Sequence, residues 1–422
     1  MTAPPRRRHV YEIDVVRVLT FACVIAVHTT AHTNPADSVS ANATLMMLHF
    51  TREAFFFLTG FVLVHQYLGR TVRLGSFYWR RVKTVGVPYV LWSVIYCYLP
   101  QHWRVPDPSP VSVLSRIAQG TATYHLYFLL VSLQIYLIYP LIAKLLKATV
   151  GRHRQLLLVS GLLQAAWFTY VTYFPSTHGW LATTIAHDDA LVISYQFYVL
   201  VGAVCAFHAE RIRGYVAAHT AALALLVPPS AALALLVYFV SVARGTPADG
   251  AAAVLQPAMI PWALGAVLGL WLLGAVWSSR RVAGGPLDRV LSYGSDRSFG
   301  IFLVHPAIIG YVLDLGWVRG LPALAQTLVT YLMAVAGSLV VVEILRRSPL
   351  SVILTGREQL TRRPAEPAAP VAPNNAVRVE ETHRKDTEDA RNSSRSARAS
   401  EQAPFGRDHD GDGRRPADPV LQ

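Results

Sequence analysis

The chain has 422 residues, of which 53% are hydrophobic and only 15% are charged, and its mean hydropathy is +0.35. This composition excludes an ordinary soluble enzyme and places the chain in a lipid bilayer. The net charge of +13 does not indicate nucleic-acid binding, because the basic residues mark the ends of apolar runs and form no patch with interleaved aromatic residues.

The first apolar stretch follows Arg6–Arg8 and continues to His28 without a small-residue cleavage site. We therefore expect it to remain as the first helix and not to be removed as a signal peptide. Cys23, Cys97 and Cys205 each fall inside an apolar run, without paired spacing and without a His or Cys neighbour at ligand distance in the sequence. Neither a disulfide framework nor a metal site is expected from them.

Ten apolar runs have about the length of a spanning helix, which needs roughly 20 residues. They are Val15–Ala31, Thr44–Leu68, Val85–Pro100, Tyr124–Ala143, Leu156–Phe174, Ala190–Phe207, Tyr215–Val242, Met259–Trp277, Phe299–Leu315 and Leu321–Leu345. Pro228–Pro229 interrupts the seventh run and leaves its ends the least defined. The sequence predicts an all-α, polytopic membrane protein with about ten transmembrane helices.

The loops between the runs test this count, because Lys and Arg accumulate on the cytoplasmic side of short loops. With the N-terminus inside, the cytoplasmic segments hold 23 Lys and Arg up to Arg363, whereas the outside loops hold only Arg104, Arg116, Arg244 and Arg319. A wrong helix count would shift this alternation partway along the chain. We therefore expect both termini to be cytoplasmic, in the inner (plasma) membrane of the cell.

Two regions are predicted. Residues 1–347 form the membrane-embedded domain, and residues 348–422 form a cytoplasmic tail that is disordered from about residue 364, where Pro, Ala, Ser, Arg and Glu dominate. Residues 408–413 begin like a calcium-binding loop, but Pro419 stands where the bidentate Glu is required. No metal site is predicted there.

Arg17 and His28 are the first candidates for chemistry. They lie eleven residues apart, close to three helical turns, so they share one helix face with a rise of roughly 16 Å between them. That separation suits an extended coenzyme A thioester with its phosphates near Arg17 and its acyl carbon near His28, where a neutral imidazole can take the proton of an attacking hydroxyl. The alternative is that each residue only marks one end of a span, but titratable groups inside spans are functional candidates.

The second run carries Arg52 and Glu53 in its outer half, at a depth comparable to that of His28. Glu53 is expected to orient the His28 imidazole, and Arg52 to stabilise an oxyanion or bind an acceptor. The alternative is a structural pairing of the two residues with other helices.

The loop that follows is the most basic short loop of the chain and contains Arg80, Arg81 and Lys83. Such a cluster attracts phosphates, but anionic lipid and the positive-inside rule explain it equally, and charge alone favours that second explanation. His125 and His305 rank below His28, because a single His near a helix end is more often a polar anchor. No nucleophile elbow, Walker loop, dinucleotide fingerprint or His-Glu-x-x-His motif is present.

Taken together, these segments resemble the acyltransferase family 3 of integral membrane proteins over nearly all of the chain up to about Arg347. The matching pieces are Asp14-x-x-Arg17 followed after ten residues by His28, Phe55-Phe56-Phe57-Leu58-Thr59-Gly60-Phe61, the basic loop closing with Pro88-Tyr89, His125-Leu-Tyr-Phe-Leu with Tyr136 and Pro140, and Ser298-Phe-Gly-Ile-Phe-Leu-Val-His305-Pro306.

The resemblance implies an acyl-CoA that enters from the cytoplasm as the donor substrate and not as a bound cofactor. It also implies that His28 is the essential catalytic residue and that Arg17 and the basic loop lie near the donor. The family loop commonly has two arginines separated by two residues, whereas here Arg80 is followed at that spacing by Lys83. Lysine keeps the charge but lacks the bidentate fork.

We therefore expect an O-acyltransferase that moves an acyl group, expected to be acetyl, onto a hydroxyl of a saccharide, glycolipid or glycosylated small molecule. His28 acts as general base, Arg17 and Arg80 to Lys83 contact the donor, and Arg52 and Glu53 support the reaction. Because His28 lies toward the outer half of its helix, the acceptor is expected from the extracytoplasmic side or from within the membrane.

Two other classes remain open. A transporter or exporter of polysaccharide or organic acid would line its pathway with the same Arg, Glu and His residues. Its expected signs, inverted repeats and paired broken helices, are absent from the sequence apart from Pro228–Pro229. A membrane sensor would bind a partner through the tail, so that deleting everything after Pro364 would silence a sensor but leave an enzyme active.

Overall fold

The computed structural model describes residues 9–70, 72–99, 109–174, 178–179, 182 and 187–360. All regular structure in this part of the chain is helical, which confirms the all-α prediction for it. The elements are α1 (Tyr11–Thr33), α2 (Val39–Leu48), α3 (Thr51–Tyr67), α4 (Leu74–Arg81), the π-helical turn η1 (Val82–Gly86), α5 (Val87–Tyr98), α6 (Pro110–Gln119), α7 (Tyr127–Ala148), α8 (His153–Tyr173), the 3-10 turns η2 (Asp188–Ala190) and η3 (Val192–Tyr195), α10 (Gln196–Phe207), α11 (Ala209–Ala224), α12 (Val227–Ala243), α13 (Ala248–Ala251), α14 (Met259–Ser279), α15 (Pro286–Leu313), α16 (Gly316–Arg319), α17 (Ala323–Arg347) and α18 (Ser351–Thr355).

Six helices of the described chain are long and apolar enough to cross a membrane, and the number rises to seven if the pair α10 and α11, bent by 91°, counts as one broken span. They are α1, α2 with α3, α7, α8, α14 and α17. Each of the ten apolar runs contains a helix, but α5 has only 12 residues and α12 only 17. The chain is thus a multi-pass membrane protein, and the count of ten and the side of the termini stay predictions.

The seventh apolar run is divided between two helices. It covers the second half of α11 and nearly all of α12, which meet at Leu225–Leu226. Pro228 and Pro229 stand in the first turn of α12, where proline removes no helical hydrogen bond because the first turn has no partner for its N–H groups. His219 inside α11 has non-helical backbone angles, φ −124° and ψ 22°, so this part of the chain is kinked twice.

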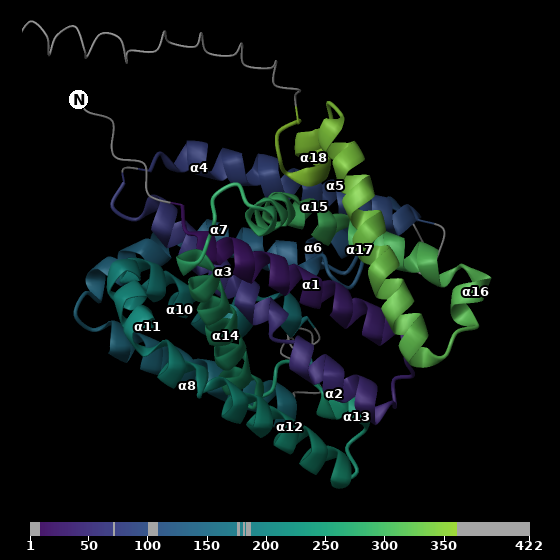
Figure 1. The fold of residues 1–422 in the computed structure, drawn as a ribbon, viewed down its shortest axis with the longest axis horizontal. Helices are drawn as coiled ribbons and strands as arrows, with labels where there is room; N and C mark the ends of the chain where they lie inside the picture. Colours follow the sequence, from purple (N-terminus) through teal and green to yellow (C-terminus); the bar gives the residue numbers. More distant parts are fainter. Residues whose placement is uncertain are drawn as a thin grey trace, which may run out of the picture. The chain divides into compact units, whose positions relative to one another are not determined.

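Helix α1 lies at the centre of the helical unit. It packs against α14, α15 and α17, and also contacts α2 and α3; Figure 1 shows it running through the middle of the unit between α17 and α14. Helix α1 therefore faces other helices over most of its length. A polar residue on this helix has to find its partners inside the protein.

The last helix, α18, packs against α5, α15, α17 and η1. The indole N–H of Trp92 donates to the carbonyl of Leu354 over 2.9 Å, and the N–H of Leu360 donates to the carbonyl of Arg346 over 2.8 Å. Residues 348–360, which the sequence assigned to the tail, therefore pack with the helices, and the compact unit ends at Leu360. The disorder predicted from residue 364 lies outside the described residues.

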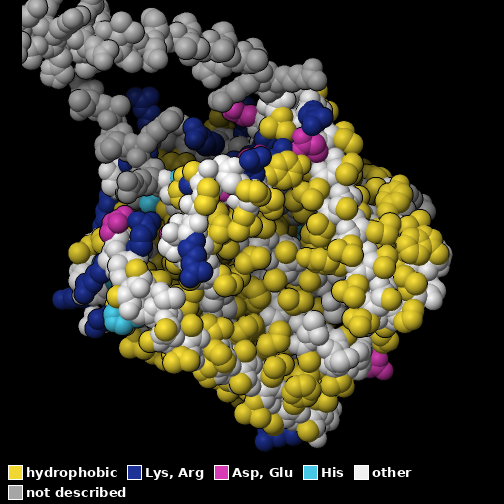
Figure 2. Space-filling model, viewed as in Figure 1, with side chains coloured by type: hydrophobic (Ala, Val, Ile, Leu, Met, Phe, Trp, Pro, Cys, Tyr) yellow, Lys and Arg dark blue, Asp and Glu magenta, His cyan; other side chains and the backbone are white. Residues whose placement is uncertain are grey.

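The surface of the helical unit is largely apolar. Exposed leucine, valine and isoleucine side chains follow α7, α8 and α17, among them Leu137, Leu162 and Leu332 at 67%, 62% and 65% exposure. In Figure 2 hydrophobic side chains cover the middle of the visible face, whereas Lys and Arg gather over its upper and left parts, near α4, α18 and α11. Such an apolar belt with basic ends is the surface that a bilayer requires.

Helices α3 and α10 approach until their backbones touch. A Cβ placed on Gly60 would lie 2.1 Å from the carbonyl oxygen of Val199, and one on Gly202 would lie 2.0 Å from that of Phe57. Small residues permit such close packing between membrane helices, where dispersion and not the hydrophobic effect drives association. Glycine is thus required at both positions for space.

Replacing either glycine should loosen this pair. We expect Gly202→Ala to destabilise the protein by about 1–3 kcal/mol, because overpacking forces the two backbones apart. The measurement is the apparent melting temperature in detergent, followed by size-exclusion chromatography of heated samples. Gly214→Ala on α11 is the matched control, since nothing lies within 4 Å of a Cβ at that position. Equal melting temperatures for the two variants would contradict the packing argument.

Candidate active site

Two cavities lie along the face of α1 that carries Arg17 and His28. The first, called here the arginine pocket, has a volume of about 380 Å³. Its polar and charged lining consists of Arg17, Thr59, Gln66, Tyr67, Arg80, Arg81, Thr84, Ser132, Tyr136, Ser298 and Arg357. Four arginines and no carboxylate from the described residues line it. A cavity with this lining is suited to a polyanion.

Arg17 is held in the arginine pocket by a relay of hydrogen bonds. Its Nη1 donates to Ser295 Oγ over 3.1 Å, and Ser295 Oγ donates to Asp14 Oδ1 over 2.6 Å. The other oxygen of Asp14 lies 2.6 Å from His9 Nε2. Because a neutral hydroxyl stands between the guanidinium and the carboxylate, Arg17 is oriented while most of its donors are left for a ligand.

The basic loop is divided by the structure. Arg80 and Arg81 line the arginine pocket, and the Arg81 guanidinium lies 4.7 Å from the ring centroid of Tyr136. Lys83 is exposed on η1 and does not line the pocket. Two of the three predicted loop residues are thus placed beside Arg17, and the third is not.

Arg357 is a pocket residue that the sequence did not predict. It follows Gly356, whose φ of 64° lies in the left-handed region and whose Cβ would lie 2.3 Å from the carbonyl oxygen of Thr84. Both conditions require glycine. This turn after α18 brings Arg357 to the pocket of Arg17, although the two residues stand at opposite ends of the compact unit in sequence.

The second cavity, called here the histidine pocket, has a volume of about 360 Å³. Its polar and charged lining consists of His28, His32, His49, Thr51, Arg52, Tyr124, His125, Tyr127 and Asp189. Val24, Val27, Phe55, Phe128 and Phe302 supply most of the apolar lining. A mostly apolar cavity with a few convergent polar groups is the usual form of a small-molecule site.

His28 lies in a cluster of rings within this pocket. Its ring centroid is 4.3 Å from that of Tyr124 and 5.3 Å from that of His305, and His125 lies 5.4 Å from His305. The sequence ranked His125 and His305 below His28, whereas the structure brings all three together from α1, α15 and the turn before α7. Only the packing of three separate elements reveals this cluster.

Several nitrogen atoms of the cluster have no hydrogen-bond partner within the described residues. His305 Nδ1 lies 3.1 Å from the carbonyl oxygen of Ile301 and must donate to it, which leaves Nε2 as an acceptor. Neither that Nε2 nor either nitrogen of buried His125 has a partner among the described side chains. Because buried polar atoms are normally hydrogen-bonded, these nitrogens are candidates to contact a polar ligand group.

Arg52 and Glu53 differ in their access to the histidine pocket. Arg52 lines the histidine pocket and donates from Nη1 to the hydroxyl of Tyr127 over 3.0 Å. Glu53 is completely buried, does not line the pocket, and makes no hydrogen bond to His28 among the described contacts. Since α3 packs on α10 through the face that carries Gly60, Glu53 has Tyr198 of α10 as an electrostatic neighbour. The expected orientation of His28 by Glu53 has no support in this geometry.

The turn η2 adds acidic residues that the sequence did not single out. Asp189 lines the histidine pocket, and its carbonyl accepts the hydroxyl of Tyr195 over 3.1 Å. Burial raises the pKa of the Asp189 carboxyl, and the nearby Arg52 guanidinium opposes that rise. Burial and the neighbouring Asp189 likewise raise the pKa of Asp188 to about 6. The only sequence signal was an acidic pair next to the sixth apolar run.

The described residues contain no group of three or more His, Cys, Asp or Glu side chains that could hold a metal ion. What the two cavities offer is an anion-binding end and a titratable end, and α1 contributes residues to both. That arrangement can bind an anionic group at one end and exchange a proton at the other.

Comparison with known proteins agrees with this chemistry. The model of the acyltransferase 3 family, described as an acyltransferase domain, matches residues 10–344, and so confirms the resemblance noted in the sequence. No curated protein and no solved structure matches the chain.

Proposed function

We propose that this chain transfers an acyl group, expected to be acetyl, from acyl-CoA to a hydroxyl of a saccharide, glycolipid or glycosylated small molecule. The chain belongs to the acyltransferase 3 family and is an acyltransferase. The observation that carries the proposal is the pairing of an arginine-lined and a histidine-lined cavity along one face of α1. The membrane is proposed to be the plasma membrane, in keeping with the basic loops.

In this proposal the donor phosphates bind in the arginine pocket. Arg17, Arg80, Arg81 and Arg357 supply guanidinium groups, whose planar forks match phosphate oxygens. The pantetheine arm then extends along α1 toward His28, a rise of roughly 16 Å for eleven residues. Lys83 is left out of this set because its side chain is exposed outside the pocket.

The reaction is a direct transfer. His28 takes the proton of the acceptor hydroxyl as its oxygen attacks the thioester carbonyl. The new C–O bond forms, the C–S bond breaks, and the proton passes to the sulfur of the leaving group, which gives an ester and free coenzyme A thiol. Arg52, oriented by Tyr127 and lining the same pocket, supplies positive charge for the developing oxyanion.

Removing the imidazole tests the general base. We expect His28→Ala to lower transfer of label from acetyl-CoA into glycan, lipid and small-molecule fractions by about 100-fold or more, since general bases contribute on that order. Membranes carrying His219→Ala, which alters an exposed histidine on α11, serve as the control. Label that does not depend on His28 would contradict its role. No transfer by the folded wild type, from acetyl-CoA or longer acyl-CoA with native acceptors present, would favour the transporter.

The arginine pocket makes a second prediction. Arg17→Gln and Arg357→Gln should each raise the KM for acyl-CoA by about 10-fold or more, because a hydrogen bond to a charged group contributes about 1.5–3 kcal/mol. Lys83→Gln is the matched control and should leave the KM nearly unchanged. Steady-state kinetics in membranes measure all three. If Lys83→Gln raised the KM as much as Arg357→Gln does, the phosphates would be assigned to the exposed side of the basic loop and not to the arginine pocket.

The acceptor is proposed to arrive from the extracytoplasmic side or from within the membrane, because the histidine pocket lies at the opposite end of α1 from the basic loop. Right-side-out vesicles loaded with acyl-CoA should therefore acylate a water-soluble acceptor added outside. Inside-out vesicles should not acylate an acceptor confined to the outer, cytoplasmic-face solution. Acylation in that second case would place acceptor entry on the cytoplasmic side.

A further inference from the structure

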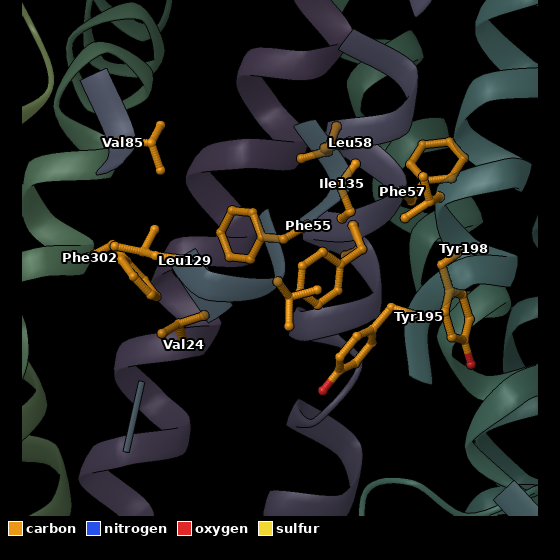
Figure 3. Packing of buried hydrophobic residues seen from close by; sticks show 14 of the residues in the cluster. Val24, Phe55, Phe57, Leu58, Val85, Leu129, Ile135, Tyr195, Tyr198 and Phe302 are labelled. Atoms are coloured by element: carbon orange, nitrogen blue, oxygen red, sulfur yellow. The ribbon is translucent and has the colours of Figure 1, made fainter. Parts of the chain in front are cut away.

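The two pockets meet at a small set of phenylalanines. Phe55, Phe128 and Phe302 line both cavities, and Phe21 lines the arginine pocket beside them. In Figure 3 the side chains of Phe55 and Phe302 project from α3 and α15 into the same space, near Val24 of α1. The residues that the two pockets share are thus aromatic.

The four phenylalanines form a closed ring. The ring centroids of Phe21 and Phe55 are 4.5 Å apart, those of Phe55 and Phe128 are 5.3 Å apart, and those of Phe128 and Phe302 are 5.3 Å apart. The fourth side, from Phe302 back to Phe21, measures 6.1 Å. All four separations fall within the range of favourable aromatic contact, so the ring is a packed layer without a polar atom.

Four helices each contribute one phenylalanine to this layer. On α1, Phe21 follows Arg17 of the arginine pocket by four residues and precedes His28 of the histidine cluster by seven. The other helices show the same order of a polar residue, a phenylalanine and a second polar residue from the arginine pocket to the histidine pocket. In the helices that run antiparallel to α1, the residue numbers decrease in this direction. The order is Thr59, Phe55 and Arg52 on α3; Ser132, Phe128 and His125 on α7 and the turn before it; and Ser298, Phe302 and His305 on α15.

Spacings of three and four residues place such groups on one helix face at successive depths. On α3, α7 and α15 a polar residue, a phenylalanine and a second polar residue therefore stand at matched heights, whereas on α1 the second polar residue, His28, lies about one turn further along. Four independent helices contribute a phenylalanine to the same middle height. An apolar layer of this kind excludes water between two polar compartments.

We propose that Phe21, Phe55, Phe128 and Phe302 form a gate between the arginine pocket and the histidine pocket, through which the acyl arm of the donor passes and which limits the size of the acyl group. This rests on the proposed function, in which phosphates bind on one side of the layer and His28 acts on the other. The side chains open by rotating about their side-chain bonds, so a short acyl group passes with the least displacement of the rings.

The first experiment widens the gate. Phe21→Ala and Phe128→Ala are the variants of choice, because these two rings are only half-buried. In membranes with acetyl-, butyryl- and hexanoyl-CoA, we expect the ratio of hexanoyl to acetyl transfer to rise by about 10-fold or more over wild type, given that one methylene in a tight pocket is worth about 10-fold.

Phe57→Ala is the matched control. Phe57 lies on the same helix as Phe55, is 6% exposed, packs against Trp271 of α14 and lines neither pocket. Loss of the Phe57 ring should make the protein less stable and lower the transfer of every acyl group by the same factor. The ratio between acyl groups should then stay unchanged. A ratio in Phe128→Ala that moves no further than in Phe57→Ala would overturn the size limit.

A second measurement tests whether the phenylalanine ring is a barrier, and it does not depend on acyl transfer. With the three native cysteines replaced by serine, Thr59→Cys places one thiol in the arginine pocket. A membrane-impermeant methanethiosulfonate reagent should label it from the cytoplasmic face of sealed vesicles and not from the opposite face, and adding Phe128→Ala should open the opposite route. Labelling from both faces with the ring intact would overturn the gate. If no acyl-CoA supports transfer while one-sided labelling holds, the proposed function fails and the barrier stands.

Discussion

The fixed length of α1 is the constraint on which the site depends. Eleven residues of continuous helix separate Arg17 from His28, and a helix that packs against its neighbours over most of its length cannot shorten that rise of roughly 16 Å. Arg17 and His28 each line a different pocket, and a single ligand that reaches both residues has to be long. Helices α3, α7 and α15 have to supply side chains at matching heights, and the antiparallel ones do so in reversed order along the chain.

The buried arginines of this protein are of two kinds, those paired directly with a carboxylate and those that are not. Arg297 and Arg346 are buried against carboxylates, with Nε of Arg297 2.8 Å from Glu343 and Nη1 of Arg346 2.7 Å from Asp296. Among the described residues, Arg17 reaches the Asp14 carboxylate through the hydroxyl of Ser295. The first two form ion pairs between α15 and α17 and stabilise the contact of these helices. Arg17 keeps positive charge directed at a cavity, and that residual charge is what makes an anionic ligand the natural occupant.

How much of this could be read from the sequence depends on whether a feature is local. Helical content and the shared face of Arg17 and His28 follow from composition and a period of 3.6 residues, and both describe a single helix. The direction of Glu53 toward α10, and the exposure of Lys83, depend on how helices rotate against one another. That rotation is not a property of one helix, so the sequence does not show that Arg52 lines the histidine pocket and that Glu53 does not.

Contacts between segments far apart in the sequence could not be predicted for the same reason. Arg357 reaches the arginine pocket because α18 folds back over α5 and η1, and because Gly356 adopts a left-handed turn against Thr84. The match to the acyltransferase family ends at residue 344, yet the wall of the pocket continues thirteen residues further. The short segment after α17 therefore contributes to the wall of the arginine pocket through Arg357.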